Sequence, residues 1–172
     1  MFECEVRPKF MRNSEAKTTA RKFSIMRLVP GQVAQFRQVN EVFARAFDDP
    51  DSYSAHKPRD EYLQGLLQKP HVIVLVALAG DEVVAGLVAY VLEKFEQERS
   101  EVYIYDLGVR EDFRRLGIAT SLINELKRHA REIGAWVVYV QADKGEEDIP
   151  AQRLYESLGE REDVFHYDID VD

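Results

Sequence analysis

The most constraining stretch of the chain is residues 101–140, in which two strand-like runs flank one helix-like run. "EVYIYDLGV" (101–109) and "AWVVYVQA" (135–142) are rich in the β-branched and aromatic residues that strands favour. Between them, apolar residues recur at helical spacing over about 116–133, and Gly134 ends that run. Two strands joined through a helix lie parallel in one sheet, with a right-handed crossover. The sequence therefore predicts an α/β fold around this unit.

The remaining segments predict further strands and helices around this crossover. Apolar residues alternate or run together in strands and recur every three or four positions in helices, with Gly and Pro at the boundaries. These patterns predict strands over 23–29, 71–79, 82–95 and 163–170, and helices over 33–47, 58–69 and 150–158. The expected fold is one α/β domain, of mixed α+β character, with a central, mostly antiparallel sheet and helices on both faces.

The first residues differ from the rest of the chain. They are polar and lack hydrophobic periodicity, so we expect a flexible extension over 1–22 and a folded domain over 23–172. The lone cysteine, Cys4, cannot form an intramolecular disulfide, which favours a reducing, cytoplasmic setting. The longest apolar run, 72–79, is far shorter than the ~20 residues of a membrane-spanning helix. We therefore expect no membrane partner.

The charge balance is acidic. The sequence holds 31 Asp and Glu against 23 Lys and Arg, a formal net charge of −8. Such a chain repels phosphate backbones and attracts cations, so nucleic acid is not an expected partner. The four histidines and the single cysteine show no metal-ligand spacing, and we expect no metal.

One turn carries a candidate site for a phosphate-bearing ligand. It is "RRLGIAT", residues 114–120, between the strand that ends at Val109 and the following helix. The first amides of a helix have no internal partner and lie at the positive end of its dipole, so they bind anions. Arg114 and Arg115 can add charge-assisted contacts, and Gly117 lets phosphates approach the backbone. Taken alone, such a pattern often forms only a solvated helix cap, but its place between a strand and a long helix, at the carboxyl end of the sheet, favours a ligand site.

The turn and its setting resemble a known superfamily. "R-R-L-G-I-A", between "YIYDLGV" and a helix, matches the pattern [RQ]-x-x-G-x-[GA] of the GNAT superfamily of acetyl-CoA-dependent N-acetyltransferases. "AQRLYESLG" (151–159) resembles that superfamily's helix with a tyrosine four residues before a glycine. The resemblance covers residue 23 to the end and implies acetyl-CoA as co-substrate. It implies cofactor contacts by Leu107, Gly108, Val109, Arg114, Arg115, Leu116, Gly117, Ile118, Ala119 and Thr120.

Longer strings resemble a narrower family. "YVLEKFEQERSEVYIYDLGV" (90–109), "YVQAD" (139–143) and the closing "HYDID" are similar to the type I aminoglycoside 3-N-acetyltransferases, which are bacterial resistance enzymes. Gly108, where we expect alanine, and the acidic loop "KGEEDI" depart from that family. These departures bear on which drugs are accepted more than on the reaction. Relatives are often dimers, so the resemblance also implies a homodimer.

Two side chains are candidates for acid–base chemistry. Asp106 matches the aspartate of the family's "YIYDL" motif, which implies a base that takes a proton from the substrate ammonium. A carboxylate that caps nearby backbone amides is the alternative. Tyr155 matches the superfamily's tyrosine, which implies a hydroxyl that protonates the leaving thiolate; a packed helix aromatic is the alternative. The amides of 107–109 would then hold the thioester oxygen.

An aminoglycoside carries several ammonium groups, so its site is expected to be a cleft lined with carboxylates. The candidates gather in the loop after residue 142 and in the predicted terminal strand, although any one of them alone fits solvated surface. The candidate substrate-binding residues are Tyr53, Glu101, Asp143, Glu146, Glu147, Asp148, Asp168 and Asp170. Trp136, at the start of a predicted buried strand, is instead expected in the core.

The residues and the resemblance together predict an aminoglycoside 3-N-acetyltransferase. Two other functions stay open, namely acetylation of a polyamine or a protein amine, and a non-catalytic module that binds acyl-CoA. A binding module needs neither a base nor a thiol acid. The presence of both Asp106 and Tyr155 therefore argues against it.

Overall fold

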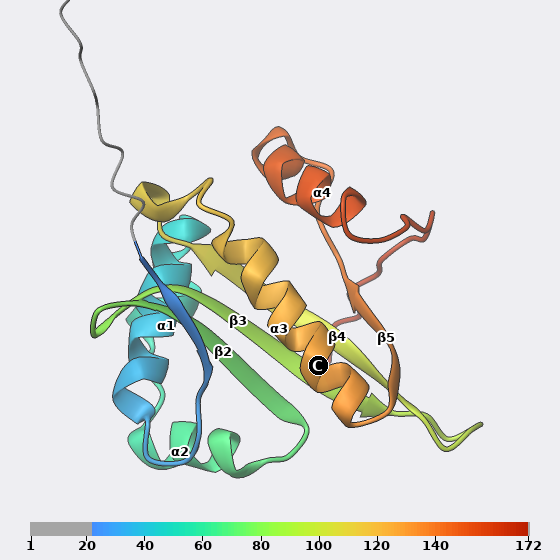
Figure 1. The fold of residues 1–172 in the computed structure, drawn as a ribbon, viewed down its shortest axis with the longest axis horizontal. Coiled ribbons are helices and arrows are strands. Elements are labelled where there is room, and N and C mark those ends of the chain that lie inside the picture. Colours follow the sequence, from blue (N-terminus) through green and yellow to red (C-terminus); the bar gives the residue numbers. More distant parts are fainter. Residues whose placement is uncertain (1–21, 172) are drawn as a thin grey trace, which may run out of the picture.

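A computed structural model describes residues 22–171 of the protein. Cys4 and residues 1–21 of the predicted extension lie outside this part, so the domain boundary at residue 22 stays a prediction. Within residues 22–171, five strands form one sheet in the order β1-β2-β3-β4-β5 (Figure 1). The strands are β1 (Ser24–Arg27), β2 (Val72–Ala79), β3 (Glu82–Glu93), β4 (Ser100–Val109) and β5 (Ala135–Val140).

The sheet is mixed. Neighbouring strands from β1 to β4 are antiparallel, and β2 and β3 form a hairpin in which Ala79 lies opposite Glu82. β4 and β5 are parallel, because the helix between them returns the chain to the same end of the sheet. The predicted mostly antiparallel sheet with one parallel crossover is confirmed.

Helices cover both faces of the sheet, as predicted. α1 (Val33–Ala46) and α2 (Asp60–Gln68) pack on one face, and α3 (Ile118–Glu132) packs on the other (Figure 1). α4 (Ile149–Glu156) follows β5, and short helical turns lie at η1 (Asp51–Ala55), η2 (Glu111–Phe113) and η3 (Glu146–Asp148). Among residues 22–171, no helix is long and apolar enough to cross a membrane.

Each face of the sheet has its own apolar core. Successive strand residues point to opposite sides, so the long apolar runs of β2 and β3 serve both faces. Leu75 and Leu87 lie in the core under α3, whereas Val74 and Val88 lie in the core under α1. Phe43 of α1 is 1% exposed and anchors the second core. The two central strands are therefore buried on both faces.

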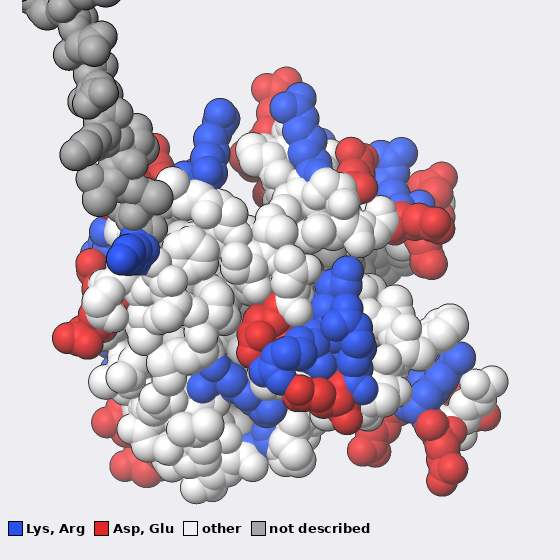
Figure 2. Space-filling model, in the orientation of Figure 1, with Lys and Arg blue, Asp and Glu red and all other residues white. Residues whose placement is uncertain are grey.

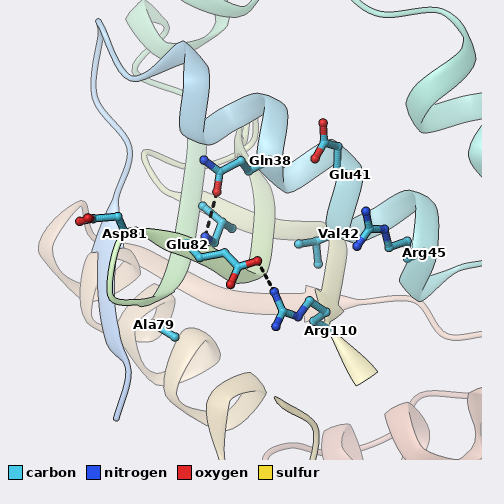
Figure 3. Close-up of a pocket in the computed structure, with 9 residues that line it drawn as sticks. Gln38, Glu41, Val42, Arg45, Ala79, Asp81, Glu82 and Arg110 are labelled. Atoms are coloured by element: carbon cyan, nitrogen blue, oxygen red, sulfur yellow. Dashed lines mark hydrogen bonds and ion pairs between the residues drawn. The ribbon is translucent and has the colours of Figure 1, made fainter. Parts of the chain in front are cut away.

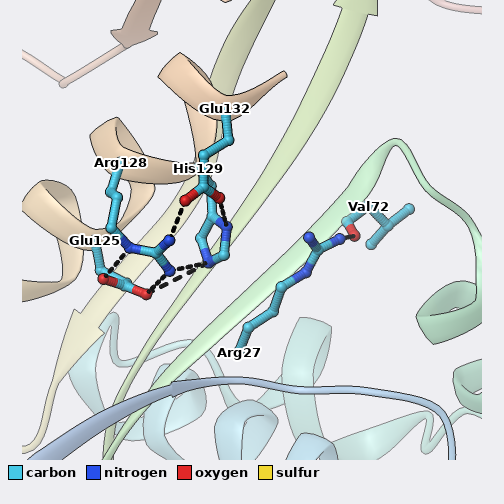
Figure 4. Close-up of polar contacts among 6 residues, drawn as sticks. All are labelled: Arg27, Val72, Glu125, Arg128, His129 and Glu132. Atoms are coloured by element: carbon cyan, nitrogen blue, oxygen red, sulfur yellow. Dashed lines mark hydrogen bonds and ion pairs between the residues drawn. The ribbon is translucent and has the colours of Figure 1, made fainter. Parts of the chain in front are cut away.

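The outer face of α3 carries a network of ion pairs. Arg128 pairs with Glu125, three residues before it, and with Glu132, four residues after it. His129 lies 3.4 Å from each glutamate, and Figure 4 shows the four side chains converging on one side of the helix. Figure 2 shows basic and acidic side chains gathered together over this face. Such exposed pairs contribute little to stability, and they leave no single-sign surface there.

A β-bulge in β4 decides which face its polar residues occupy. The pairing of β4 with β3 shifts between Ile104 and Asp106, so Tyr105 is the extra residue. Ile104 packs in the core under α3, and without the bulge strand alternation would direct residue 106 to the same core. With the bulge, Leu107 packs against that core, and Asp106 faces the α1 side. A carboxylate is thus kept out of the apolar core under α3.

Three predictions for the C-terminal part are wrong. Residues 160–171 form no strand, because a strand needs a ladder partner and the outer edge of β5 is not paired with this segment. β5 is half-buried to exposed rather than buried, because it is the last strand of the sheet. Trp136 is 61% exposed and lies outside both cores.

Candidate active site

β4 and β5 diverge where the predicted site lies. Their parallel pairing ends at Ile104 opposite Val140, although β4 continues to Val109. In the part of the chain that the structure describes, residues 106–109 therefore have a strand partner only on the β3 side. The other edge of β4 is open to an extended ligand that pairs with its backbone.

The amides on this open edge follow from the ladder with β3. The backbone N–H of Arg110 donates to the carbonyl oxygen of Val84 in β3 at 2.9 Å. Successive residues of a strand direct their N–H groups to opposite edges. The amides of Leu107 and Val109 therefore face the open edge, and that of Gly108 faces β3.

Asp106 is hydrogen-bonded to a tyrosine from the connection between α1 and α2. The hydroxyl of Tyr53, in η1, donates to Asp106 Oδ1 at 2.8 Å. The Tyr53 ring packs against Phe43 and Phe47, with ring centroids 5.7 and 5.6 Å apart. Burial raises the pKa of Asp106, and the hydrogen bond from Tyr53 opposes part of that rise. A raised pKa makes this carboxylate a stronger base than an exposed one.

Gly108 is required by the packing of α1. A Cβ on this residue would lie 2.7 Å from Cδ1 of Phe43 and 3.3 Å from Cβ of Ala46. Interiors are close-packed, so α1 lies this near to β4 only because residue 108 has no side chain. Through Phe43, the same packing supports Tyr53 and hence the hydrogen bond to Asp106.

The turn before α3 has the backbone of an anion-binding turn. Arg115 and Gly117 adopt left-handed conformations, with φ of 62° and 77°. Such residues curve successive amides toward one point. α3 begins at Ile118, and no side chain among the described residues caps it, so its first amides are available to a ligand. The conformation of Gly117 also explains why glycine stands there.

The side chains around this turn differ in exposure. Arg114 and Arg115 are exposed, and Arg114 Nε donates to the carbonyl oxygen of Val109 at 3.2 Å. The Arg114 guanidinium therefore lies beside the open edge of β4, and the predicted turn and the open edge form one region. Of the other predicted residues, Leu116 is exposed, Ile118 is buried, and Ala119 and Thr120 are half-buried in the first turn of α3.

Tyr155 lies at the margin of the core under α3. It is carried by α4, and Leu107 and Val109 pack against the same core. Burial raises the pKa of Tyr155 to about 12, and the charge of Asp148 adds to this rise. The phenol therefore stays protonated at neutral pH and can donate a hydrogen bond.

The predicted substrate-binding residues lie in four places. Tyr53 contacts Asp106, as described above. Glu101 is the second residue of β4, and its carboxylate lies 3.1 Å from Lys94 Nζ and accepts a hydrogen bond from Trp136 Nε1 at 3.2 Å. Glu101 and Asp106 are five positions apart along the strand, about 16 Å, so the two cannot hold the same ammonium group. Asp143, Glu146, Glu147 and Asp148 lie between β5 and α4, and Asp168 and Asp170 lie in the exposed C-terminal segment.

A separate hollow of about 490 Å³ lies between α1 and the turn that joins β2 and β3 (Figure 3). Gln38 accepts a hydrogen bond from the amide of Val83 at 2.9 Å, and Arg110 pairs with Glu82 and Asp112. These contacts connect α1, the hairpin and the end of β4. Neither Asp106 nor the turn before α3 lines this hollow, so we do not assign it to the active site.

Sequence reasoning missed the tyrosines near Asp106. Tyr90, Tyr103, Tyr105 and Tyr139 have rings in contact with one another. The alternation of Tyr103 and Tyr105 in "YIYDL" is a signal for a shared strand face, but nothing in the sequence marks the bulge that turns Asp106 to the same side.

The mixed sheet, the open edge of β4 and the turn before α3 together define the class of this protein. Residues 36–159 match the model of the acetyltransferase (GNAT) family. The chain belongs to this family and is an acetyl-CoA-dependent N-acetyltransferase. A comparison with curated proteins gives no match.

Among solved structures, two aminoglycoside acetyltransferases from uncultured soil metagenomic samples are similar to the chain. HMB0005 is 47% identical, with a TM-score of 0.86, over 88% of this chain and 99% of that chain. Meta-AAC0020, solved in complex with sisomicin, is 33% identical, with a TM-score of 0.80, over 87% of this chain and 97% of that chain. The aminoglycoside N-acetyltransferase AAC(6')-Iy, solved with CoA, shares the fold at 18% identity and a TM-score of 0.65, over 87% and 96% of the two chains.

Proposed function

We propose that the protein transfers the acetyl group of acetyl-CoA to the 3-N amine of an aminoglycoside, and so confers antibiotic resistance. The observation that carries this proposal is the carboxylate of Asp106. It accepts a hydrogen bond from Tyr53 and lies directly before the open edge of β4. Support comes from two similar proteins, HMB0005 and meta-AAC0020, which are aminoglycoside acetyltransferases, the second solved with sisomicin. The 3-N position and a homodimer rest on the resemblance to the type I enzymes, and a cytoplasmic location rests on the lone cysteine of the sequence.

The residues around the open edge fit a CoA thioester. Its pantetheine arm carries amide groups that can pair with the backbone of Leu107 and Val109. Its diphosphate needs hydrogen-bond donors and positive charge, which the first amides of α3 and the side chains of Arg114 and Arg115 supply. We infer that these groups hold the cofactor, with its acyl end directed toward Asp106.

Direct acetyl transfer requires a base, hydrogen-bond donors for the carbonyl oxygen and an acid for the leaving sulfur. Acetyl-CoA supplies the acetyl group as a thioester. Asp106 takes a proton from the substrate ammonium, directly or through one water, which frees the nitrogen lone pair to bond to the carbonyl carbon. The amides of Leu107 and Val109 donate to the carbonyl oxygen as it gains negative charge. Tyr155 gives a proton to the sulfur as the carbon–sulfur bond breaks, and the second proton lost by the acylated nitrogen restores the phenol.

Release of free thiol tests the proposed function. We expect free CoA to appear when micromolar protein is mixed with acetyl-CoA and gentamicin, and NMR of the product to show the acetyl group on the 3-N amine. No thiol release would contradict the proposal. Spermine or a peptide that outcompetes gentamicin would assign the enzyme to polyamines or protein amines. CoA binding without turnover of any amine would indicate a binding module.

Arg114→Ala is expected to weaken CoA binding by about 10- to 150-fold, since a hydrogen bond to a charged group contributes ~1.5–3 kcal/mol. Isothermal titration of CoA measures the effect. Arg161→Ala is the matched control, because Arg161 is exposed and pairs with Glu156 at 3.6 Å, outside the proposed cofactor site. Equal CoA affinity of the Arg114→Ala variant and the wild type would remove Arg114 from the phosphate site.

A further inference from the structure

Four tyrosines from three strands form one aromatic surface, which we call the tyrosine strip: Tyr90 of β3, Tyr103 and Tyr105 of β4, and Tyr139 of β5. The ring centroids of Tyr90 and Tyr105 are 5.6 Å apart, and those of Tyr103 and Tyr105 are 5.9 Å apart. Tyr103 stacks on Tyr139 at 5.0 Å. The rings therefore form a continuous row across the sheet.

The tyrosine strip leads from Asp106 to the edge of the sheet. Tyr105 directly precedes Asp106 and is 60% exposed. Burial is the main cause that raises the pKa of Tyr103, and the charges of Tyr105 and Asp106 are among the smaller causes. This is consistent with one site that these three side chains share. At the β5 end, Trp136 and Val137 are 61% and 38% exposed. The row of rings is thus continuous with the candidate base and open to solvent.

Polar groups border the strip near β5. The hydroxyl of Tyr103 donates to Gln141 Oε1 at 2.9 Å, and Gln141 Nε2 lies 2.9 Å from His166 Nδ1. His166 Nε2 lies 3.0 Å from the carboxylate of Asp168. This chain of contacts brings one of the predicted substrate-binding acids from the C-terminal segment to the strip.

A second carboxylate lies near the start of β4 and β5. Glu101 accepts the hydrogen bond from Trp136, and the guanidinium of Arg99 lies over the Trp136 ring, 4.1 Å from its centroid. The ion pair with Lys94 holds the pKa of Glu101 below its usual range, so it is ionised at neutral pH. The strip therefore combines aromatic faces, hydroxyl groups and two carboxylates.

We propose that the tyrosine strip binds the sugar rings that flank the acetylated ring of the aminoglycoside; this inference rests on the proposed function. The faces of a sugar ring carry C–H groups that pack on aromatic rings, and ammonium groups are attracted to tyrosine faces. Tyrosine hydroxyls can donate to and accept from sugar hydroxyls. The carboxylate of Asp168 matches an ammonium group that an aminoglycoside carries beyond the one at Asp106, whereas Glu101 is held by Lys94 and Trp136. A linear polyamine offers no ring faces to the strip.

Tyr139→Val tests the role of the strip. Tyr139 contacts Tyr103 on β5, away from Asp106, and valine keeps the strand propensity of the position. We expect kcat/KM for sisomicin, a three-ring substrate, to fall about tenfold or more, as loss of a cation–π contact and a stacked ring implies. For 2-deoxystreptamine, the central ring alone, kcat/KM is expected to stay unchanged. Calorimetric Kd values for both ligands are measured alongside.

Phe95→Ala is the control, because Phe95 is a fully exposed aromatic residue between β3 and β4. An equal loss for both substrates would assign Tyr139 a structural role, and no loss for either would exclude sugar binding at the strip. A dimer that becomes monomeric in Tyr139→Val by sedimentation would make the strip an interface between copies and overturn the proposal. If the wild type turns over neither substrate, the proposed function fails, and the two sisomicin Kd values still decide whether the strip binds sugars.

Discussion

Replacing Asp106 with Asn is expected to lower kcat/KM for gentamicin by about 10²- to 10⁴-fold, the usual contribution of a positioned general base. The amide has the size of the carboxylate, and its oxygen can still accept the hydrogen bond from Tyr53. It cannot take a proton from the substrate ammonium. CoA affinity is expected to stay unchanged, because the proposed phosphate contacts lie on the turn before α3. Thiol release and CoA calorimetry measure the two effects separately.

The same substitution is expected to change the dependence of stability on pH. Burial raises the pKa of Asp106 in the folded protein above its value in the unfolded chain. The folded state then binds the proton more tightly, so the ionised carboxylate costs stability as pH rises above the unfolded pKa of about 3.9. Asp106→Asn removes this cost. Its thermal midpoint should match that of the wild type near pH 3 and exceed it at pH 7.

Asp163→Asn is the control for both measurements, because Asp163 is an exposed carboxylate in the C-terminal segment. Its turnover and thermal midpoint are expected to equal those of the wild type at each pH. In the wild type, the acid limb of the pH profile of kcat/KM should lie above the pKa of an ordinary aspartate and be absent in Asp106→Asn. Unchanged turnover of Asp106→Asn would remove Asp106 from the role of base.

The local patterns of the chain predicted most of the elements and the region of the site. Helical spacing over 116–133 and the strand-like runs beside it were enough for the parallel crossover. The turn before α3 could also be recognised, since its Gly117 and its free helix amides are local features. These features depend only on residues that are neighbours in the sequence, so they could be predicted from it.

The face on which Asp106 lies could not be predicted. It depends on the extra residue at Tyr105, and a bulge is set by how two strands pair rather than by one strand's pattern. The contact of Tyr53 with Asp106 likewise joins residues 53 positions apart. In the segment 163–170, by contrast, a predicted strand does not form. Its alternating apolar residues, such as Phe165, Tyr167 and Ile169, fit a strand pattern but remain exposed without a ladder partner. Pairing between distant segments therefore determines all three features, and the local pattern of one segment could not predict them.

Gly108→Ala is expected to lower the free energy of unfolding by about 1–3 kcal/mol, the usual effect of an overpacked core. The added methyl group would lie 2.7 Å from the ring of Phe43, which is 1% exposed and has little room to move. Displacement of Phe43 should also move Tyr53, so kcat is expected to fall with stability. Urea unfolding measures the first effect. Gly65→Ala, inside α2, is the matched control, because a Cβ there meets no described atom within 4 Å and should stabilise the helix by about 0.5–1 kcal/mol.

A smaller residue in α1 should reverse the loss of stability caused by Gly108→Ala. Phe43→Leu removes the ring atoms that the methyl group of Gly108→Ala meets, so the double variant is expected to be more stable than the sum of the two single effects by at least about 0.5 kcal/mol. Additive effects would mean that the clash with Phe43 is not the cause of the loss. Gly108 stands where the resemblance to the type I family leads us to expect alanine. Coupling between the two positions would explain that departure as the partner of a bulky Phe43, rather than as a feature of drug recognition.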